Sequence, residues 1–154
     1  RNGAAIDSFG VGTEMVTSRD APALGGVYKL VEQIHGGRAI PRMKFSSGKA
    51  TYPCKKQIYR KRDGDGNFLE DVIGLEGESV DGIPLLTQVM KDGKACYPTP
   101  TIQEIQGASS DNLVHLPKPF KRLSNAEVYP ITKSNGLERK RLEAEKIIAL
   151  QNNE

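Results

Sequence analysis

The sequence predicts an α/β fold in three parts, and one observation supports each part. A short, largely apolar run at residues 4–9 leads directly into Gly10-Val11-Gly12, which is typical of a buried strand that feeds a turn. Residues 26–136 contain short strand-like runs between glycine and proline turns, which indicates a mainly β region. Residues 137–154 contain a helical pattern followed by a short tail.

The first part, residues 1–25, raises a problem of topology. Its strand has no parallel partner strand and no crossover helix in this sequence, and a lone parallel strand is not a stable unit. We therefore expect residues 1–25 to be the last piece of an α/β architecture whose earlier strands lie outside the given sequence. The sequence also starts with Arg1 instead of Met, so we expect it to be processed or a fragment.

The mainly β region is divided by turn signals, of which residues 63–67, Asp-Gly-Asp-Gly-Asn, are the clearest. This segment predicts a hairpin turn. The alternative is an EF-hand calcium loop, but Phe68 and Gly74 occupy the positions where that loop needs Gly and Glu. Strands are expected at residues 27–32, 38–45, 57–61 and 68–73, a short helix at 101–105, and irregular chain at 107–112 and around the prolines at 117, 119 and 130.

The terminal helix is expected at residues 137–150, where charged side chains alternate with apolar ones. Its apolar residues form an imperfect stripe at helical spacing among Glu, Lys and Arg residues. The stripe consists of Leu142, Ile147, Ile148 and Leu150.

The composition is that of an ordinary water-soluble protein and predicts no membrane partner. Of the 154 residues, 37% are hydrophobic and 27% charged, and no apolar run approaches the roughly 18 residues of a membrane span. No signal peptide pattern is present, so a cytoplasmic location is expected. Cys54 and Cys96 lack the spacing of a zinc site and are expected to be unpaired thiols, and no metal site is expected.

Charge is distributed unevenly although the net charge is only +3. Residues 33–62 contain nine Lys or Arg and no acidic residue, whereas residues 63–90 contain seven Asp or Glu and no basic residue. We expect the two blocks to face each other as neighbouring strands. A nucleic-acid-binding patch at residues 55–62 is the alternative, but the acidic strand would neutralise it, so no nucleic-acid partner is expected.

The turn at Gly10 to Thr13 is a candidate phosphate site. Glycines permit positive φ and close backbone approach, so consecutive amides can converge on an anion, and Thr13 adds a hydroxyl. The P-loop and dinucleotide fingerprints do not match, since no Gly-Lys pair follows and Met15 stands where the third glycine would be. On the glycines alone, a plain tight turn is favoured over a phosphate site.

Longer blocks of the sequence carry a more specific signal. In order and spacing, the chain resembles the C-terminal portion of the nicotinate phosphoribosyltransferase family from about residue 3 to residue 131. The blocks that carry the resemblance are "IDSFGVGTEMVTSRDAPALGGVYKLVE", "PRMKFSSGKATYPCKKQIYR" and "LLTQVMKDGKACYPTPTIQEI".

The resemblance implies a fold and an activity. The fold would be an irregular α/β barrel, as in type II phosphoribosyltransferases, whose last strand and phosphate loop lie here before a mainly β C-terminal region. The enzyme would join nicotinate to 5-phosphoribosyl 1-diphosphate, with assistance from ATP and Mg²⁺, to give nicotinate mononucleotide and diphosphate for NAD biosynthesis. It would act as a cytoplasmic homodimer. The phosphate loop would then sit where barrels tend to bind phosphate.

The same resemblance implies roles for individual residues. Gly10, Val11, Gly12 and Thr13 would form the cradle for the 5-phosphate. Arg19 and Lys29 would present positive charge to phosphates, while their alternatives are a surface ion pair and a solvated strand residue. Lys44 and Lys49 are weaker candidates for contacts with diphosphate or ATP. The candidate residues for binding phosphate, diphosphate or ATP are therefore Gly10, Val11, Gly12, Thr13, Arg19, Lys29, Lys44 and Lys49.

No catalytic residue is expected in this chain. The phosphorylatable His and the nicotinate-binding residues of the family would lie upstream, whereas His35 and His115 are expected to be turn or surface histidines. The family usually has Pro-Gly where Pro53-Cys54 stands, so this turn must accommodate a side chain. We expect the chain alone to be inactive, and the alternative function is a non-catalytic fragment or split-gene structural module.

Overall fold

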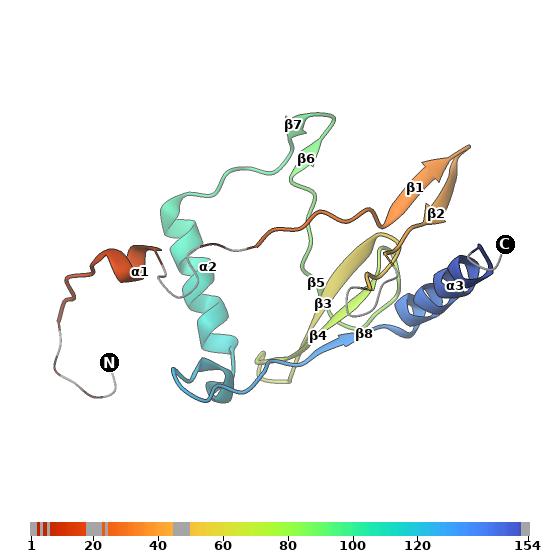
Figure 1. The fold of residues 1–154 in the computed structure, drawn as a ribbon. Helices are drawn as coiled ribbons and strands as arrows, with labels where there is room; N and C mark the ends of the chain where they lie inside the picture. Colours follow the sequence, from red (N-terminus) through yellow and green to blue (C-terminus); the bar gives the residue numbers. More distant parts are fainter. Residues whose placement is uncertain are drawn as a thin grey trace.

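The computed structural model describes residues 3, 5, 7–17, 23, 25–44 and 50–151. Within them, the largest element is a four-stranded sheet with the strand order β5-β3-β4-β8, and helix α3 packs beside β4 (Figure 1). The strands are β3 (Lys56–Arg62), β4 (Phe68–Leu75), β5 (Ile83–Pro84) and β8 (Ile131–Lys133). The fold is therefore a mixed α/β arrangement, as predicted at that level.

The hairpin of β3 and β4 confirms the predicted turn at residues 63–67. One carboxylate oxygen of Asp63 accepts hydrogen bonds from the backbone amides of Asp65 at 3.0 Å and Asn67 at 2.8 Å. Gly66 takes a φ of +85°, a conformation that glycine adopts without strain. The Asp side chain and the glycine together turn the chain so that β3 and β4 pair antiparallel.

The basic and acidic blocks face each other across this hairpin, as the sequence predicts. Arg60 lies opposite Asp71 and its guanidinium donates two hydrogen bonds to that carboxylate, at 2.9 and 2.8 Å. Lys61 lies opposite Glu70, with 2.9 Å between Nζ and Oε1. Cross-strand pairs of opposite charge support the register of the sheet.

The core is small and lies between the sheet and α3 (Asn135–Gln151), which confirms the predicted terminal helix. The imperfect apolar stripe of the helix is not its buried face, because Leu142, Ile147 and Leu150 are exposed and Ile148 is half-buried. The helix instead buries Leu137 and Ala144, because β8 aligns parallel to β4 and delivers the helix with that face toward the sheet. The buried apolar side chains among the described residues are Pro53, Cys54, Tyr59, Phe68, Val72, Leu137 and Ala144.

The N-terminal strands differ from those predicted. The described residues of 4–9, namely 5 and 7–9, do not form a strand, and helix α1 (Thr13–Thr17) follows. Strand β1 (Glu32–His35) begins where the predicted strand 27–32 ends, and β2 (Arg38–Pro41) is shorter than predicted. A strand persists only while it has a partner, and β1 and β2 pair solely with each other among the described residues.

Helix α2 (Ile102–His115) replaces the predicted short helix and the loop expected after it. Thr101 caps its N-terminus: the amide of Glu104 donates to the Thr101 hydroxyl at 3.3 Å, and the Glu104 carboxylate accepts from the Thr101 amide at 2.7 Å. This reciprocal capping box was visible in the sequence as Thr-x-x-Glu. The remaining short elements are β6 (Met90–Lys91), β7 (Lys94–Ala95) and the 3-10 helix η1 (Lys118–Lys121).

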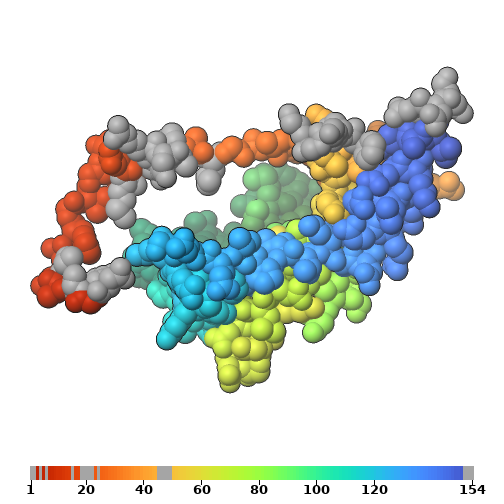
Figure 2. All heavy atoms as spheres, turned by 60° about the horizontal axis from the view of Figure 1, so that its bottom comes forward, coloured from red at the N-terminus to blue at the C-terminus, as the bar shows by residue number. Residues whose placement is uncertain are grey.

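Two ends of the molecule can be distinguished in Figures 1 and 2. Residues 7–17 and α2 lie at one end, and α3 with the β1–β2 hairpin lies at the other. In Figure 2 the described residues 7–17 lie apart from the sheet. This separation determines which of the predicted site residues approach one another.

Candidate functional site

The predicted phosphate loop is exposed to solvent. Residues 9–14 line a hollow of about 680 Å³, and helix α1 begins at its edge with Thr13. The carbonyl oxygen of Gly12 accepts a hydrogen bond from the amide of Val16 at 3.4 Å, and that of Thr13 accepts one from the Thr17 hydroxyl at 2.7 Å. The loop therefore presents backbone to solvent at the start of a short helical turn.

The glycines of this loop provide open space, not unusual backbone angles. Neither Gly10 nor Gly12 has a positive φ, contrary to the expected use of glycine in a tight turn. A Cβ added at either position would have no described heavy atom within 4 Å. Because no neighbouring group in the described chain occupies that space, an anion could approach the backbone there.

The basic candidates are spread along the chain. Lys29 lies in the exposed segment before β1, and Lys44 lies exposed after β2, where its amide donates to the Thr51 hydroxyl at 2.8 Å. The loop and the β1–β2 hairpin lie at opposite ends of the molecule in both views, so the structure does not bring Lys44 to the loop (Figures 1 and 2). Arg19 and Lys49 lie outside the described residues.

The turn at Pro53-Cys54 is stabilised by an internal lysine. The Lys56 ammonium donates to the carbonyl oxygens of Tyr52, Pro53 and Cys54, at 2.8, 3.1 and 2.6 Å. Cys54 adopts a φ of +65°, which explains why a glycine suits this position and confirms that the turn accommodates a side chain here. Burial raises the pKa of the Cys54 thiol, so the thiol is less nucleophilic than an exposed one.

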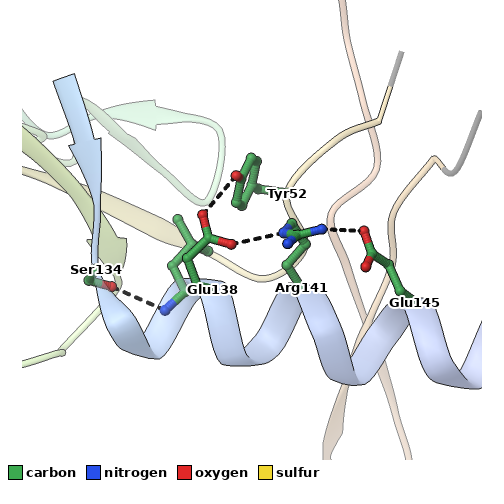
Figure 3. Close-up of polar contacts among 6 residues, drawn as sticks. Tyr52, Ser134, Glu138, Arg141 and Glu145 are labelled. Carbon is green, nitrogen blue, oxygen red and sulfur yellow. Dashed lines mark hydrogen bonds and ion pairs between the residues drawn. The ribbon is translucent and has the colours of Figure 1, made fainter. Parts of the chain in front are cut away.

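Helix α3 is joined to residue 52 by a row of polar contacts (Figure 3). The Tyr52 hydroxyl donates to Glu138 at 2.9 Å, and the Arg141 guanidinium donates to the other oxygen of that carboxylate at 2.8 Å and to Glu145. The hydrogen bonds from Arg141 and Tyr52 hold the pKa of Glu138 below its usual value. Since these charges pair with each other, the row serves to fix α3 in place.

The start of α3 is held by a carboxylate from the connection between β4 and β5. Glu78 accepts hydrogen bonds from the Ser134 hydroxyl at 2.6 Å and from the amides of Leu75 at 2.9 Å and Gly136 at 3.1 Å. The Ser134 oxygen in turn accepts from the amide of Leu137 at 3.1 Å, as Figure 3 shows. A hydroxyl cap and a carboxylate both stabilise a helix N-terminus, so this joint is structural.

His115 lies at the surface, as expected from the sequence, and its ring is partly covered by neighbouring side chains. It is the last residue of α2, and its ring stacks on Phe68 with 6.0 Å between the ring centroids. The Arg60 guanidinium covers the same Phe68 ring at 4.2 Å from the centroid. These contacts fix the C-terminal end of α2 to the hairpin. His35 lies exposed at the end of β1.

Two features are absent from the described residues. No group of three or more His, Cys, Asp or Glu side chains among them could hold a metal ion. Likewise, none of their helices is long and apolar enough to span a bilayer.

Comparisons with known proteins identify the same family that the sequence blocks resemble. Residues 79–141 match the family described as the nicotinate phosphoribosyltransferase C-terminal domain. Nicotinate phosphoribosyltransferase pncB2 of Mycobacterium tuberculosis is 39% identical over 132 residues, which cover 84% of this chain and 27% of that protein. Nicotinate phosphoribosyltransferase of Bacillus subtilis is 34% identical over 155 residues, covering 84% of this chain and 32% of that protein.

A solved structure extends the likeness to the fold. The crystal structure of human nicotinic acid phosphoribosyltransferase superposes with a TM-score of 0.64 at 28% identity, covering 79% of this chain and 27% of the human chain. The chain thus spans about a quarter to a third of the length of these relatives. The resemblance predicted from the sequence blocks is confirmed, and the chain is related in sequence and in structure to the C-terminal portion of the nicotinate phosphoribosyltransferases.

Proposed function

We propose that the chain is the C-terminal part of an enzyme that joins nicotinate to 5-phosphoribosyl 1-diphosphate, giving nicotinate mononucleotide and diphosphate with assistance from ATP. The observation that carries this proposal is the 39% identity to the Mycobacterium tuberculosis enzyme over 84% of the chain. In this proposal residues 1–25 complete an α/β barrel built by a preceding portion, and the enzyme is a cytoplasmic homodimer.

The loop at residues 10–13 is proposed to bind the 5-phosphate of the ribosyl donor or product. Its exposure and the open space above Gly10 and Gly12 support this role, because no described atom outside their chain neighbours lies within 4 Å of a Cβ built at either glycine. Lys29 and Arg19 would add positive charge, with smaller contributions from Lys44 and Lys49. Because the described part of the chain does not gather these residues, the rest of the enzyme or the second subunit would complete the site.

ATP and Mg²⁺ enter this proposal through the family alone. The described residues contain no cluster of three acidic or histidine side chains that would fit a Mg²⁺ ion. We therefore assign no residue of this chain to the metal and derive no step of the reaction through it.

A chimera tests the proposed function. The C-terminal region of the Mycobacterium tuberculosis relative that matches this chain is replaced by residues 1–154, and formation of nicotinate mononucleotide is followed by chromatography. We expect activity from the chimera and none from the chain alone. A folded but inactive chimera, or product formed by the chain alone, would contradict the proposal; the first result would favour the alternative of a structural module.

The phosphate loop can be tested in the same chimera with Gly12→Ala. The added methyl group meets no described atom within 4 Å, so the unfolding midpoint of the isolated chain should not change. In the chimera, KM for 5-phosphoribosyl 1-diphosphate should rise about tenfold, equivalent to about 1.4 kcal/mol. Gly64→Ala, in the β3–β4 turn, is the matched control, since its Cβ also meets no described atom. An unchanged KM would remove residues 10–13 from the phosphate site.

A further inference from the structure

Helix α2 lacks a packing partner within the described chain. The structure describes all 14 of its residues, and none of them is buried. Isolated helices of fewer than about 12–15 residues are marginal in water, and a capping box satisfies only the amides at one end. The contact between His115 and Phe68 attaches the C-terminal end of the helix, but the remaining turns need a further surface to pack against.

One face of α2 carries the apolar residues that such a surface would cover. Ile102, Ile105 and Leu113 recur at intervals of three and eight residues, which places them on the same side of a helix. Their exposures are 71%, 54% and 55%. Gln103 and Ser110 lie on another side of the helix, which they share with the exposed Val114.

The connection before α2 continues the apolar surface and gives it a concave shape. Tyr97, Pro98 and Pro100 lie against the first turns of α2. Together with Thr99, Glu104, Ile105 and Ala108 they line a hollow of about 500 Å³. Tyr97 is half exposed. Single exposed apolar residues are common on protein surfaces, whereas a contiguous apolar patch with a hollow is typical of an interaction site.

We propose that α2 and residues 97–100 form the docking surface for the preceding portion of the same polypeptide, which would present an apolar face to them. This inference rests on the proposed function. The chain spans 27% of the Mycobacterium tuberculosis relative, so most of that length is available as the occupant. Residues 7–17, through which such a portion would be joined, lie at the α2 end of the molecule in both views (Figures 1 and 2).

Amide hydrogen exchange tests this docking without relying on activity. It is measured at α2 in the isolated chain and in the chimera with the Mycobacterium tuberculosis relative. In the chimera, exchange at α2 should be slower by about tenfold or more, because a covered helix opens less often. Exchange at α2 that is equally fast in both proteins would overturn the proposal, even if the chimera makes nicotinate mononucleotide. Slow exchange in an inactive chimera would support docking while contradicting the proposed reaction.

Substitutions on the two sides of α2 locate the docking surface. Ile105→Glu and Leu113→Glu should abolish the slow exchange and lower the unfolding midpoint of the chimera, whereas Ser110→Glu should do neither. Circular dichroism of each variant in the isolated chain controls for loss of the helix itself. If the isolated chain forms a dimer that Ile105→Glu dissociates, and exchange at α2 is already slow in that dimer, then the occupant is a second copy and the proposal is wrong.

Discussion

Helices α2 and α3 are similar in length and differ in nearly everything that stabilises them. Each begins at a hydroxyl cap, Thr101 for α2 and Ser134 for α3, so the local chemistry at the two starts is comparable. Yet α3 buries Leu137 completely against the sheet, while no residue of α2 is buried. The comparison shows that capping defines where a helix starts, whereas burial depends on the surface that the rest of the chain provides.

The largest expected difference between the helices concerns their leucines. Leu137→Ala removes a side chain with 0% exposure and should lower the free energy of unfolding by about 2–5 kcal/mol. Leu113→Ala, on the exposed face of α2, should change it by less than about 0.5 kcal/mol in the isolated chain. Urea unfolding monitored by circular dichroism measures both. Equal losses in the free energy of unfolding for the two variants would mean that Leu113 is packed as closely as Leu137, contrary to its exposure.

A smaller difference in stability is expected when a glycine of each helix is replaced by alanine. A Cβ at Gly136 would overlap the Glu78 carboxylate, which three hydrogen bonds hold in place, so Gly136→Ala should cost about 1–3 kcal/mol of stability. Gly107→Ala in α2 meets no described atom within 4 Å and should stabilise that helix by up to about 1 kcal/mol. Urea unfolding reports the first change and helical circular dichroism the second. An unchanged free energy of unfolding in Gly136→Ala would show that Glu78 does not fix the start of α3.

The smallest expected effect concerns pH, because both helix starts carry a carboxylate. Burial of Glu78 acts to raise its pKa, but hydrogen bonds from Ser134 and from backbone amides hold that pKa below its ordinary value. The amide and hydroxyl of Thr101 lower the pKa of Glu104. A lowered folded-state pKa contributes stability above the ordinary Glu value of about 4.3, and this contribution is lost as the pH falls below it.

The two carboxylates should nevertheless report different events. Glu78→Gln should flatten the loss of global stability between about pH 5 and pH 3, because Glu78 links the sheet to α3. Glu104→Gln should alter only the helicity of α2 over the same range, because its hydrogen bonds lie within one capping box. Unfolding curves and helical circular dichroism at several pH values distinguish the two outcomes. An unchanged pH slope in Glu78→Gln would assign the acid sensitivity to another group.

Much of the sheet could be predicted from local sequence. Residues 63–67 contain both the Asp that accepts backbone amides and the glycine that takes a positive φ, so the hairpin follows from its own residues. The opposite charges of residues 55–62 and 63–81 likewise predict that β3 and β4 are neighbours. Helix α2 was missed beyond residue 105, because residues 107–112 are mostly polar and include a glycine. The spacing of Thr101 and Glu104 as a capping box is a local signal for the start of this helix.

The sequence by itself determined the relationship to the nicotinate phosphoribosyltransferases, through the order and spacing of blocks along the chain. It also determined the β3–β4 hairpin and the presence of the terminal helix, because these two depend on residues close together in the chain. Only the tertiary structure decided which face of α3 is buried, how Glu78 meets Ser134, and that Phe68 lies between Arg60 and His115. These contacts join segments about 8 to 56 residues apart. No local periodicity specifies such contacts, because they depend on how the sheet and the helices are placed together.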